Sequence, residues 1–164
     1  MRRRCATGSG GIGSKPPATW QSFGEYLDHL RGLGTSVNVV QFVGHGALRY
    51  ATVGGENRPA TADEQKAMER HLAEALDAGA WGYSTGLVYA PSIYGSTEEL
   101  IALAKSMAKR GGHYFSHVRG EAATLETAYV EAIRIGEEGA CPCRSRTSRP
   151  RGARTGARWS ARCA

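Results

Sequence analysis

The sequence has no long apolar segment. Its 164 residues contain no run approaching the roughly 18 consecutive apolar residues that a membrane-spanning helix needs. The arginine-rich start is followed by Gly, Ser and Pro instead of the apolar core of a secretory signal. We therefore expect a cytoplasmic protein, and the 41% hydrophobic and 22% charged residues are typical of one globular domain.

Both ends of the chain lack acidic residues. Residues 1–19 contain four Arg or Lys and residues 141–164 contain seven Arg, whereas all 15 Asp and Glu lie in residues 20–140 beside 10 Lys and Arg. The net charge of +6 thus describes the ends, and the middle carries −5 (10 basic minus 15 acidic residues). Binding of nucleic acid or another anionic partner is an alternative that rests on the Arg-rich tail alone, and we expect no nucleic-acid partner.

The middle of the chain also lacks cysteine. Cys5 lies in the first segment, and Cys141, Cys143 and Cys163 lie in the last. The Cys-Pro-Cys spacing is one residue shorter than the CxxC of zinc modules, and no second pair matches it. The cysteines therefore do not predict a structural zinc site.

Helical and strand patterns alternate between residues 20 and 140. Apolar residues three or four apart predict helices over about 20–33, 61–78, 97–110 and 122–137, and short apolar runs predict strands over 37–43, 80–83 and 113–117. These strands are too apolar for a sheet with one exposed face, which favours parallel strands with crossover helices. The predicted fold class is α/β.

The common nucleotide signatures GxGxxG and GxxxxGK[ST] are absent. Polar and glycine-rich residues instead follow each predicted strand, around His45, around Ser84 and from Ser116 to Glu121. Since α/β proteins place their sites at the carboxyl ends of parallel strands, we expect His45, Ser84 and His117 to share one rim.

His117 is the strongest candidate for chemistry, because Arg119 and Glu121 follow it closely. A neutral imidazole at a strand end can ligate a metal. The alternative is a backbone-bonded histidine beside an Arg119–Glu121 ion pair. His45, between two glycines, either approaches a ligand or lies solvated in a tight turn. Tyr89 either walls a pocket or covers a helix end.

Four segments together resemble one enzyme family. They are SFGEYLDHL, VNVVQFVGHGALR, GAWGYSTGLVYAP and EELIALAKSMAKRGGHYFSHVRGE, in this order within residues 20–140. They are similar to the N-acyl-D-amino-acid deacylases (D-aminoacylases) of the amidohydrolase superfamily. The resemblance implies a metal-bearing (β/α)8 barrel with a small β domain, zinc as cofactor, and hydrolysis of the amide bond of N-acyl-D-amino acids.

The resemblance also assigns a role to His117, which falls on the zinc-ligand histidine of the family's SH[IV]R segment. The family's bridging cysteine, second ligand histidine and general-base aspartate have no match in residues 20–140, so we predict no catalytic residue. The residues that we predict to bind the N-acyl-D-amino acid are His45, Ser84, Tyr89, Arg119 and Glu121.

The chain is too short for a closed barrel, which typically needs about 250 residues. We expect about three βα units of a partial (β/α)8 barrel over residues 20–140, after an unmatched, disordered segment 1–19. A non-catalytic α/β domain that binds a small molecule is a second alternative.

The Arg-rich segment 141–164 has a composition that is typical of disordered segments, and also of a gene translated in a shifted reading frame. One permitted set of codons for it, read from the third base of the first codon, translates as PVQISHLKAAGRENWGKVERALR. That translation is a strand ending in SHLK and then an amphipathic helix, which is what the resemblance implies next. We expect an out-of-frame, disordered tail and a truncated chain that is inactive alone.

Overall fold

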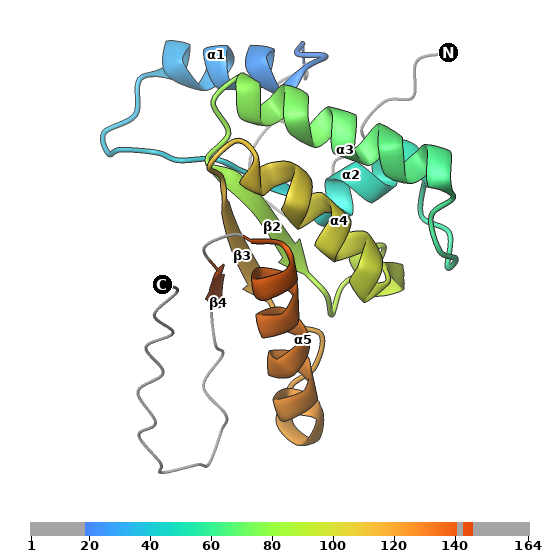
Figure 1. Cartoon of the computed structure of the whole chain (residues 1–164). Helices are drawn as coiled ribbons and strands as arrows, with labels where there is room; N and C mark the ends of the chain where they lie inside the picture. Colours follow the sequence, from blue (N-terminus) through green and yellow to red (C-terminus); the bar gives the residue numbers. More distant parts are fainter. Residues whose placement is uncertain (1–18, 141–142, 146–164) are drawn as a thin grey trace.

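The computed structural model describes residues 19–140 and 143–145. It contains a sheet of four strands, β1 (Phe42–Gly44), β2 (Gly82–Gly86), β3 (His113–His117) and β4 (Cys143–Ser145). Neighbouring strands are all parallel, and their order in the sheet is their order in the sequence (Figure 1). The disorder predicted for 1–19 and 141–164 falls almost entirely outside the described residues. The exceptions are Thr19 and Cys143–Ser145, and the latter form β4.

Helices connect the strands, as the periodicity predicts. They are α1 (Phe23–Leu33), α2 (His45–Thr52), α3 (Ala62–Asp77), α4 (Thr97–Ala108) and α5 (Leu125–Glu138), with short 3-10 turns at η1 (Ser92–Tyr94) and η2 (Ala122–Thr124).

Side-chain caps set where these helices begin. Thr61 and Glu64 form a reciprocal capping box at the start of α3, each side chain accepting a hydrogen bond from the other residue's backbone N–H. At the start of α4, the Ser96 hydroxyl accepts a hydrogen bond from the N–H of Glu99. These bonds satisfy backbone donors that a helix otherwise leaves free at its first turn.

Three elements differ from the sequence prediction. The strand predicted over 80–83 is β2 at Gly82–Gly86, so Ser84 lies within this strand instead of after it. The predicted turn around His45 is instead the start of α2, with Gly44 as its N-cap. The predicted strand 37–43 is a strand only at Phe42–Gly44, and Val37, Val39 and Val40 are exposed. Of this run only Phe42 and Val43 pair with β2. The β-branched residues before them have no partner backbone in the described structure, and β-propensity alone does not make them a strand.

The main core lies between the sheet and helices on one of its faces (Figure 1). When strands follow one another in the order of the sequence, right-handed crossovers place successive helices on the same face. β1, β2 and β3 each contribute one apolar side chain to this core, and α3 and α4 contribute most of the others. The buried residues include Val43, Tyr83, Tyr114, Met68, Leu72, Leu100, Leu103 and Met107.

The opposite face of the sheet carries a cluster of aromatic rings that are less covered. The ring centroid of Phe42 lies 5.9 Å from those of both Trp81 and Phe115, and Trp81 stacks on His113 at 4.7 Å. The side chain of Trp81 is 51% exposed. Parallel sheets normally bury both faces, so the described residues cover only one face of this sheet fully.

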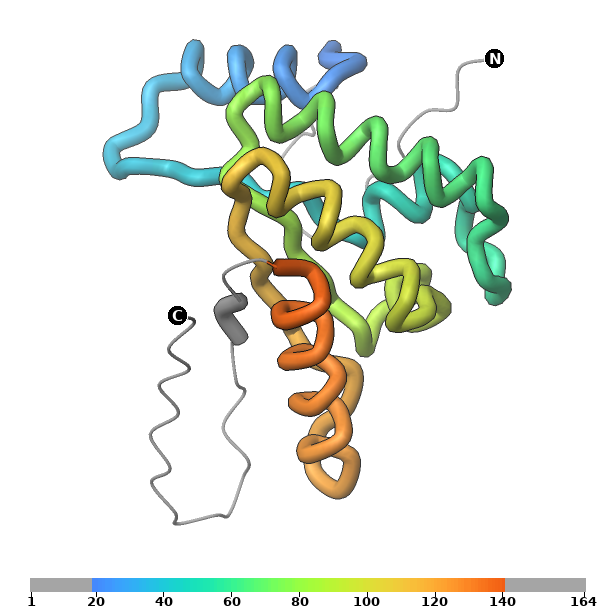
Figure 2. Tube along the Cα trace, viewed as in Figure 1, coloured from blue at the N-terminus to red at the C-terminus, as the bar shows by residue number. Residues whose placement is uncertain are grey.

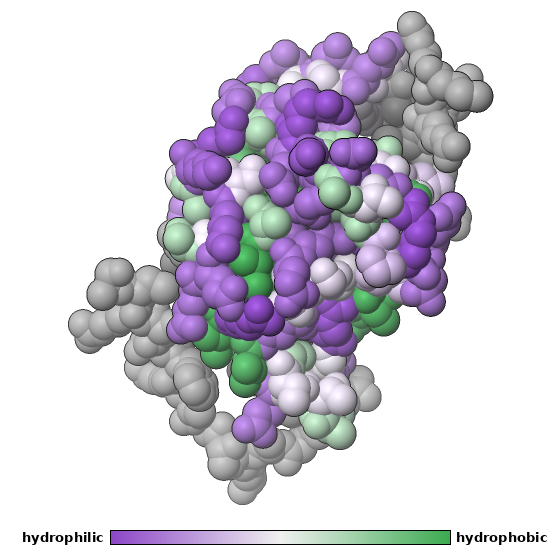
Figure 3. Space-filling model, turned by 45° about the vertical axis from the view of Figure 1, so that its right-hand side comes forward, coloured by the Kyte–Doolittle hydropathy of each residue, from purple (hydrophilic) through white to green (hydrophobic). Residues whose placement is uncertain are grey.

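The outer surface carries mixed polar and apolar side chains (Figure 3). Across the described ranges, no helix combines the length and apolar character needed to cross a membrane. The connection from α1 to β1 makes a wide excursion away from the other elements (Figure 2).

Candidate functional site

The strand register brings the predicted site residues to one rim of the sheet. Gly44 pairs with Ser84, and Gly86 pairs with His117. His45 directly follows Gly44, so a strand spacing of about 4.8 Å puts its Cα on the order of 10 Å from that of His117. The strand register therefore agrees with a shared rim at the backbones of these residues.

A shallow hollow of about 300 Å³ lies at this rim. The residues around it include His45, Ser84, Tyr89 and Ser92 together with the glycines that end β1 and β2. Three of these four are predicted substrate-binding residues. Their binding of substrate stays a prediction.

His117 ends β3 beside this hollow. Its side chain is 36% exposed, and its Nε2 lies 3.1 Å from Oε1 of Glu121. The Tyr89 ring meets the imidazole edge-on, with 5.6 Å between centroids. His117, Glu121 and Tyr89 thus form the exposed part of the rim.

The described residues alone do not fit a catalytic zinc. Within them, no three His, Cys, Asp or Glu side chains cluster closely enough to hold a metal ion. His117 and Glu121 are one imidazole and one carboxylate, whereas catalytic zinc sites use three protein ligands and leave one position open. His117 is one candidate ligand that needs others from outside the described ranges.

Arg119 makes its contacts with the protein. Its guanidinium pairs with Glu131, Nε lying 2.9 Å from Oε2. It also donates to the backbone carbonyls of Ile93, at 2.7 Å, and Gly95, at 2.9 Å. These bonds tie the segment after Tyr89 to the residues that follow β3. The prediction that Arg119 binds substrate is not tested by them.

The interpretation of His45 as a solvated turn residue is wrong, because its side chain is fully buried. Its Nδ1 lies 2.8 Å from the Ser92 hydroxyl and its Nε2 lies 2.7 Å from Oε1 of Glu99. Arg49, one helical turn later in α2, donates to both Glu99 oxygens at 2.9 and 2.6 Å and to the carbonyl of Arg58 at 2.7 Å. We call Ser92, His45, Glu99 and Arg49 the buried relay.

Burial and the neighbouring charges set the protonation of the buried relay. Loss of solvent lowers the pKa of His45 below its ordinary value, and Glu99 opposes this while Arg49 and Arg119 add to it. Burial by itself raises the pKa of Glu99, but hydrogen bonds from His45 and Arg49 outweigh burial and lower it. The geometry thus fits a neutral imidazole whose Nε2–H donates to a carboxylate and whose Nδ1 accepts from Ser92.

Sequence reasoning missed Arg49, Ser92 and Glu99. The available signals were the four-residue spacing of His45 and Arg49 on one helix face, and a carboxylate at Glu99 directly before the apolar run Leu100–Ile101. Neither signal identifies the partner, because Ser92 and Glu99 lie 47 and 54 residues after His45.

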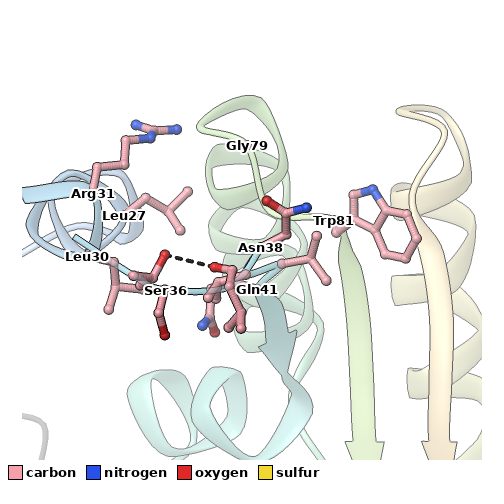
Figure 4. A pocket seen from close by; sticks show the side chains of 12 residues that line it. Leu27, Leu30, Arg31, Ser36, Asn38, Gln41, Gly79 and Trp81 are labelled. Atoms are coloured by element: carbon pink, nitrogen blue, oxygen red, sulfur yellow. Dashed lines mark hydrogen bonds between the residues drawn. The ribbon is translucent and has the colours of Figure 1, made fainter. Parts of the chain in front are cut away.

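A second, larger hollow of about 620 Å³ lies at the other end of the strands. Leu27, Arg31, Asn38, Gln41 and Trp81 are among its lining residues (Figure 4). Gln41 precedes β1 and Trp81 precedes β2, so this hollow is at the amino ends of the strands, away from the rim. None of the predicted site residues lines it.

Comparison with known proteins gives consistent relatives. No family model matches the chain. The chain is 39% identical over 119 residues to a D-aminoacylase of Alcaligenes xylosoxydans xylosoxydans, a match that covers 73% of this chain and 25% of that protein. The chain thus spans about a quarter of the length of the curated relatives that it matches.

Solved structures agree with the sequence match. A crystal structure of D-aminoacylase, described as defining a novel subset of amidohydrolases, superposes with a TM-score of 0.74 at 35% identity and covers 84% of this chain and 31% of its own. N-acyl-D-glutamate deacylase from Bordetella bronchiseptica, complexed with zinc and a phosphonate inhibitor, superposes at 0.72 with 38% identity over 74% of this chain and 26% of its own. These matches confirm the resemblance to the N-acyl-D-amino-acid deacylases.

Proposed function

We propose that this relative of the N-acyl-D-amino-acid deacylases is a segment of a zinc-dependent hydrolase that cleaves the amide bond of an N-acyl-D-amino acid. The observation that carries the proposal is the place of His117. It ends β3 at the carboxyl rim of a parallel sheet, within a chain that superposes on D-aminoacylase with a TM-score of 0.74. In barrel enzymes of this kind, residues at that rim carry the chemistry.

The segment corresponds to about three βα units of a (β/α)8 barrel. The sequential strand order with helices on one face supports this, since doubly wound sheets reverse their strand order and carry helices on both faces. The aromatic face formed by Phe42, Trp81 and Phe115 supports it too. In a closed barrel that face lies inside, where the remaining strands would cover it.

His117 is the proposed metal ligand, and the rim around it is the proposed substrate site. Ser84 and Tyr89 line the hollow there, and Glu121 lies beside His117. The remaining ligands and the general base belong to parts of such an enzyme beyond the described residues. The chain alone is therefore proposed to be inactive, and its proposed partner is a small N-acyl-D-amino acid in the cytoplasm.

The experiment expresses the chain with the reading frame after Ala140 changed to the predicted one, together with the sequence that this frame encodes downstream. We expect release of D-amino acid from N-acetyl-D-amino acids by the restored protein and none by the 164-residue chain. His117→Ala in the restored protein is expected to abolish both zinc binding and turnover, since it removes a direct metal bond.

The matched control is His71→Ala, because the His71 side chain is 43% exposed and, among the described residues, pairs with Glu74 alone. It should leave zinc content and turnover unchanged. Full turnover by the restored His117→Ala protein, with zinc measured in the same sample, would show that His117 is not the ligand.

A further inference from the structure

We propose that the buried relay positions the rim loop, residues 87–95, so that Tyr89 stands against His117. That Tyr89 belongs to a substrate site at this position rests on the proposed function. The positioning itself rests on contacts that join the loop to α2 and α4, and it gives His45 and Arg119 roles that act through Tyr89.

The first contact holds the loop from its buried side. The Ser92 hydroxyl lies 2.8 Å from Nδ1 of His45, whose other nitrogen lies 2.7 Å from Glu99. Arg49 fixes Glu99 with bonds to both carboxylate oxygens. Because Ser92 is the first residue of the loop's 3-10 turn, this chain of bonds ties the loop to two helices at one point.

A second observation shows how closely the loop packs on the buried relay. A Cβ atom added at Gly95 would lie 2.7 Å from Cε1 of His45 and 2.9 Å from Oε1 of Glu99. The loop backbone therefore rests directly on the imidazole and the carboxylate. Only glycine allows this approach without moving the two side chains.

Arg119 holds the same loop from the other side. It donates to the carbonyls of Ile93 and Gly95, and Glu131 neutralises its charge at 2.9 Å. The Glu131 carboxylate also accepts a hydrogen bond from Thr97 at the start of α4. The segment Ser92–Gly95 is thus bonded directly by His45 of α2 on one side and by Arg119, which follows β3, on the other. Glu99 of α4 and Glu131 of α5 hold these two side chains in turn.

These anchors fix Tyr89 through the backbone. The N–H of Tyr89 donates to the carbonyl of Gly86, and the carbonyl of Tyr89 accepts from the N–H of Ile93. The Tyr89 side chain is 62% exposed, so packing alone does not set its position. Hydrogen bonds are directional, so they can fix the orientation of the loop backbone at Tyr89 where apolar contacts do not. This is the role that we assign to the buried relay beneath the loop.

The test measures backbone hydrogen exchange by mass spectrometry in the 164-residue chain at low micromolar concentration. Ser92→Ala and His45→Gln each break the first link of the relay, and His71→Gln is the control that breaks an exposed His–Glu pair. We expect exchange in the rim loop to rise about tenfold or more in the first two variants, while α4 residues 100–107 change less. The control should change neither.

A second readout reports Tyr89 itself. The edge-on ring shifts the proton resonances of the His117 imidazole, and Tyr89→Leu gives the value without that ring. In Ser92→Ala the His117 resonances should move toward the Tyr89→Leu value. The inference is overturned if the rim loop already exchanges at the unprotected rate in the unmodified chain, or if loop and α4 exchange rise by the same factor.

Neither readout requires metal, substrate or turnover. A restored enzyme without deacylase activity would refute the proposed function and leave the exchange result standing. Unchanged loop exchange in an active restored enzyme would refute only the positioning role.

Discussion

Glu99→Gln is the substitution for which the structure predicts the largest loss of stability at a single polar side chain. The Glu99 carboxylate is 5% exposed and accepts bonds from Arg49, which is fully buried, and from His45. Glutamine keeps the shape but removes the charge, and its amide N–H2 group faces donors. Arg49 is then left as a buried cation without a counter-charge.

The expected size of the effect follows from that unpaired charge. Removing one partner of a buried ion pair costs about 3–5 kcal/mol, against a total stability of roughly 5–15 kcal/mol for a domain. For a chain of this size each 1 kcal/mol lowers Tm by about 2–4 °C, so the variant should melt roughly 6–20 °C lower. Urea unfolding followed by far-UV circular dichroism measures the loss.

Two comparisons make the reasoning refutable. Glu74→Gln removes a carboxylate that is 62% exposed and faces His71, and it should change stability by no more than about 0.5 kcal/mol. Arg49→Met combined with Glu99→Gln removes the stranded cation and should be more stable than Glu99→Gln alone. A loss below about 1 kcal/mol in Glu99→Gln, or a double variant that is less stable than the single one, would show that the pair is not an isolated buried ion pair.

Two further predictions concern pH and packing. Burial lowers the folded-state pKa of His45 below 6.5. The unfolded chain therefore binds a proton at His45 more readily than the folded chain, and stability should fall as pH drops below about 6.5. The urea midpoints at pH 7.5 and 5.5 should differ less in His45→Gln than in the unmodified chain, and an equal difference would contradict the assignment. Gly82→Ala places a Cβ against the backbone of His113 and should disrupt β2–β3 pairing. The same change at Gly55, which has open space around it, should not. Equal thermal melts of the two variants would show that the strands can separate without cost.

The sequence by itself determined the elements that depend on local pattern. Apolar periodicity and the Thr61–Glu64 capping signal located α3, and the run from His113 to His117 is β3 with the predicted bounds. Such signals lie within one or two turns of the chain, so a single segment carries them. The four family-like segments added the deacylase resemblance, which the relatives confirm.

The tertiary structure alone decided the surroundings of the site residues. His45 became a buried member of a relay because α4 and the rim loop bring Glu99 and Ser92 to it, and Arg119 found Glu131 on α5. The strand predicted over 37–43 shortened because only its last residues meet β2. Periodicity shows which face of an element is apolar. The partner of a polar side chain depends instead on how segments far apart in the sequence pack together, and no local pattern encodes that packing.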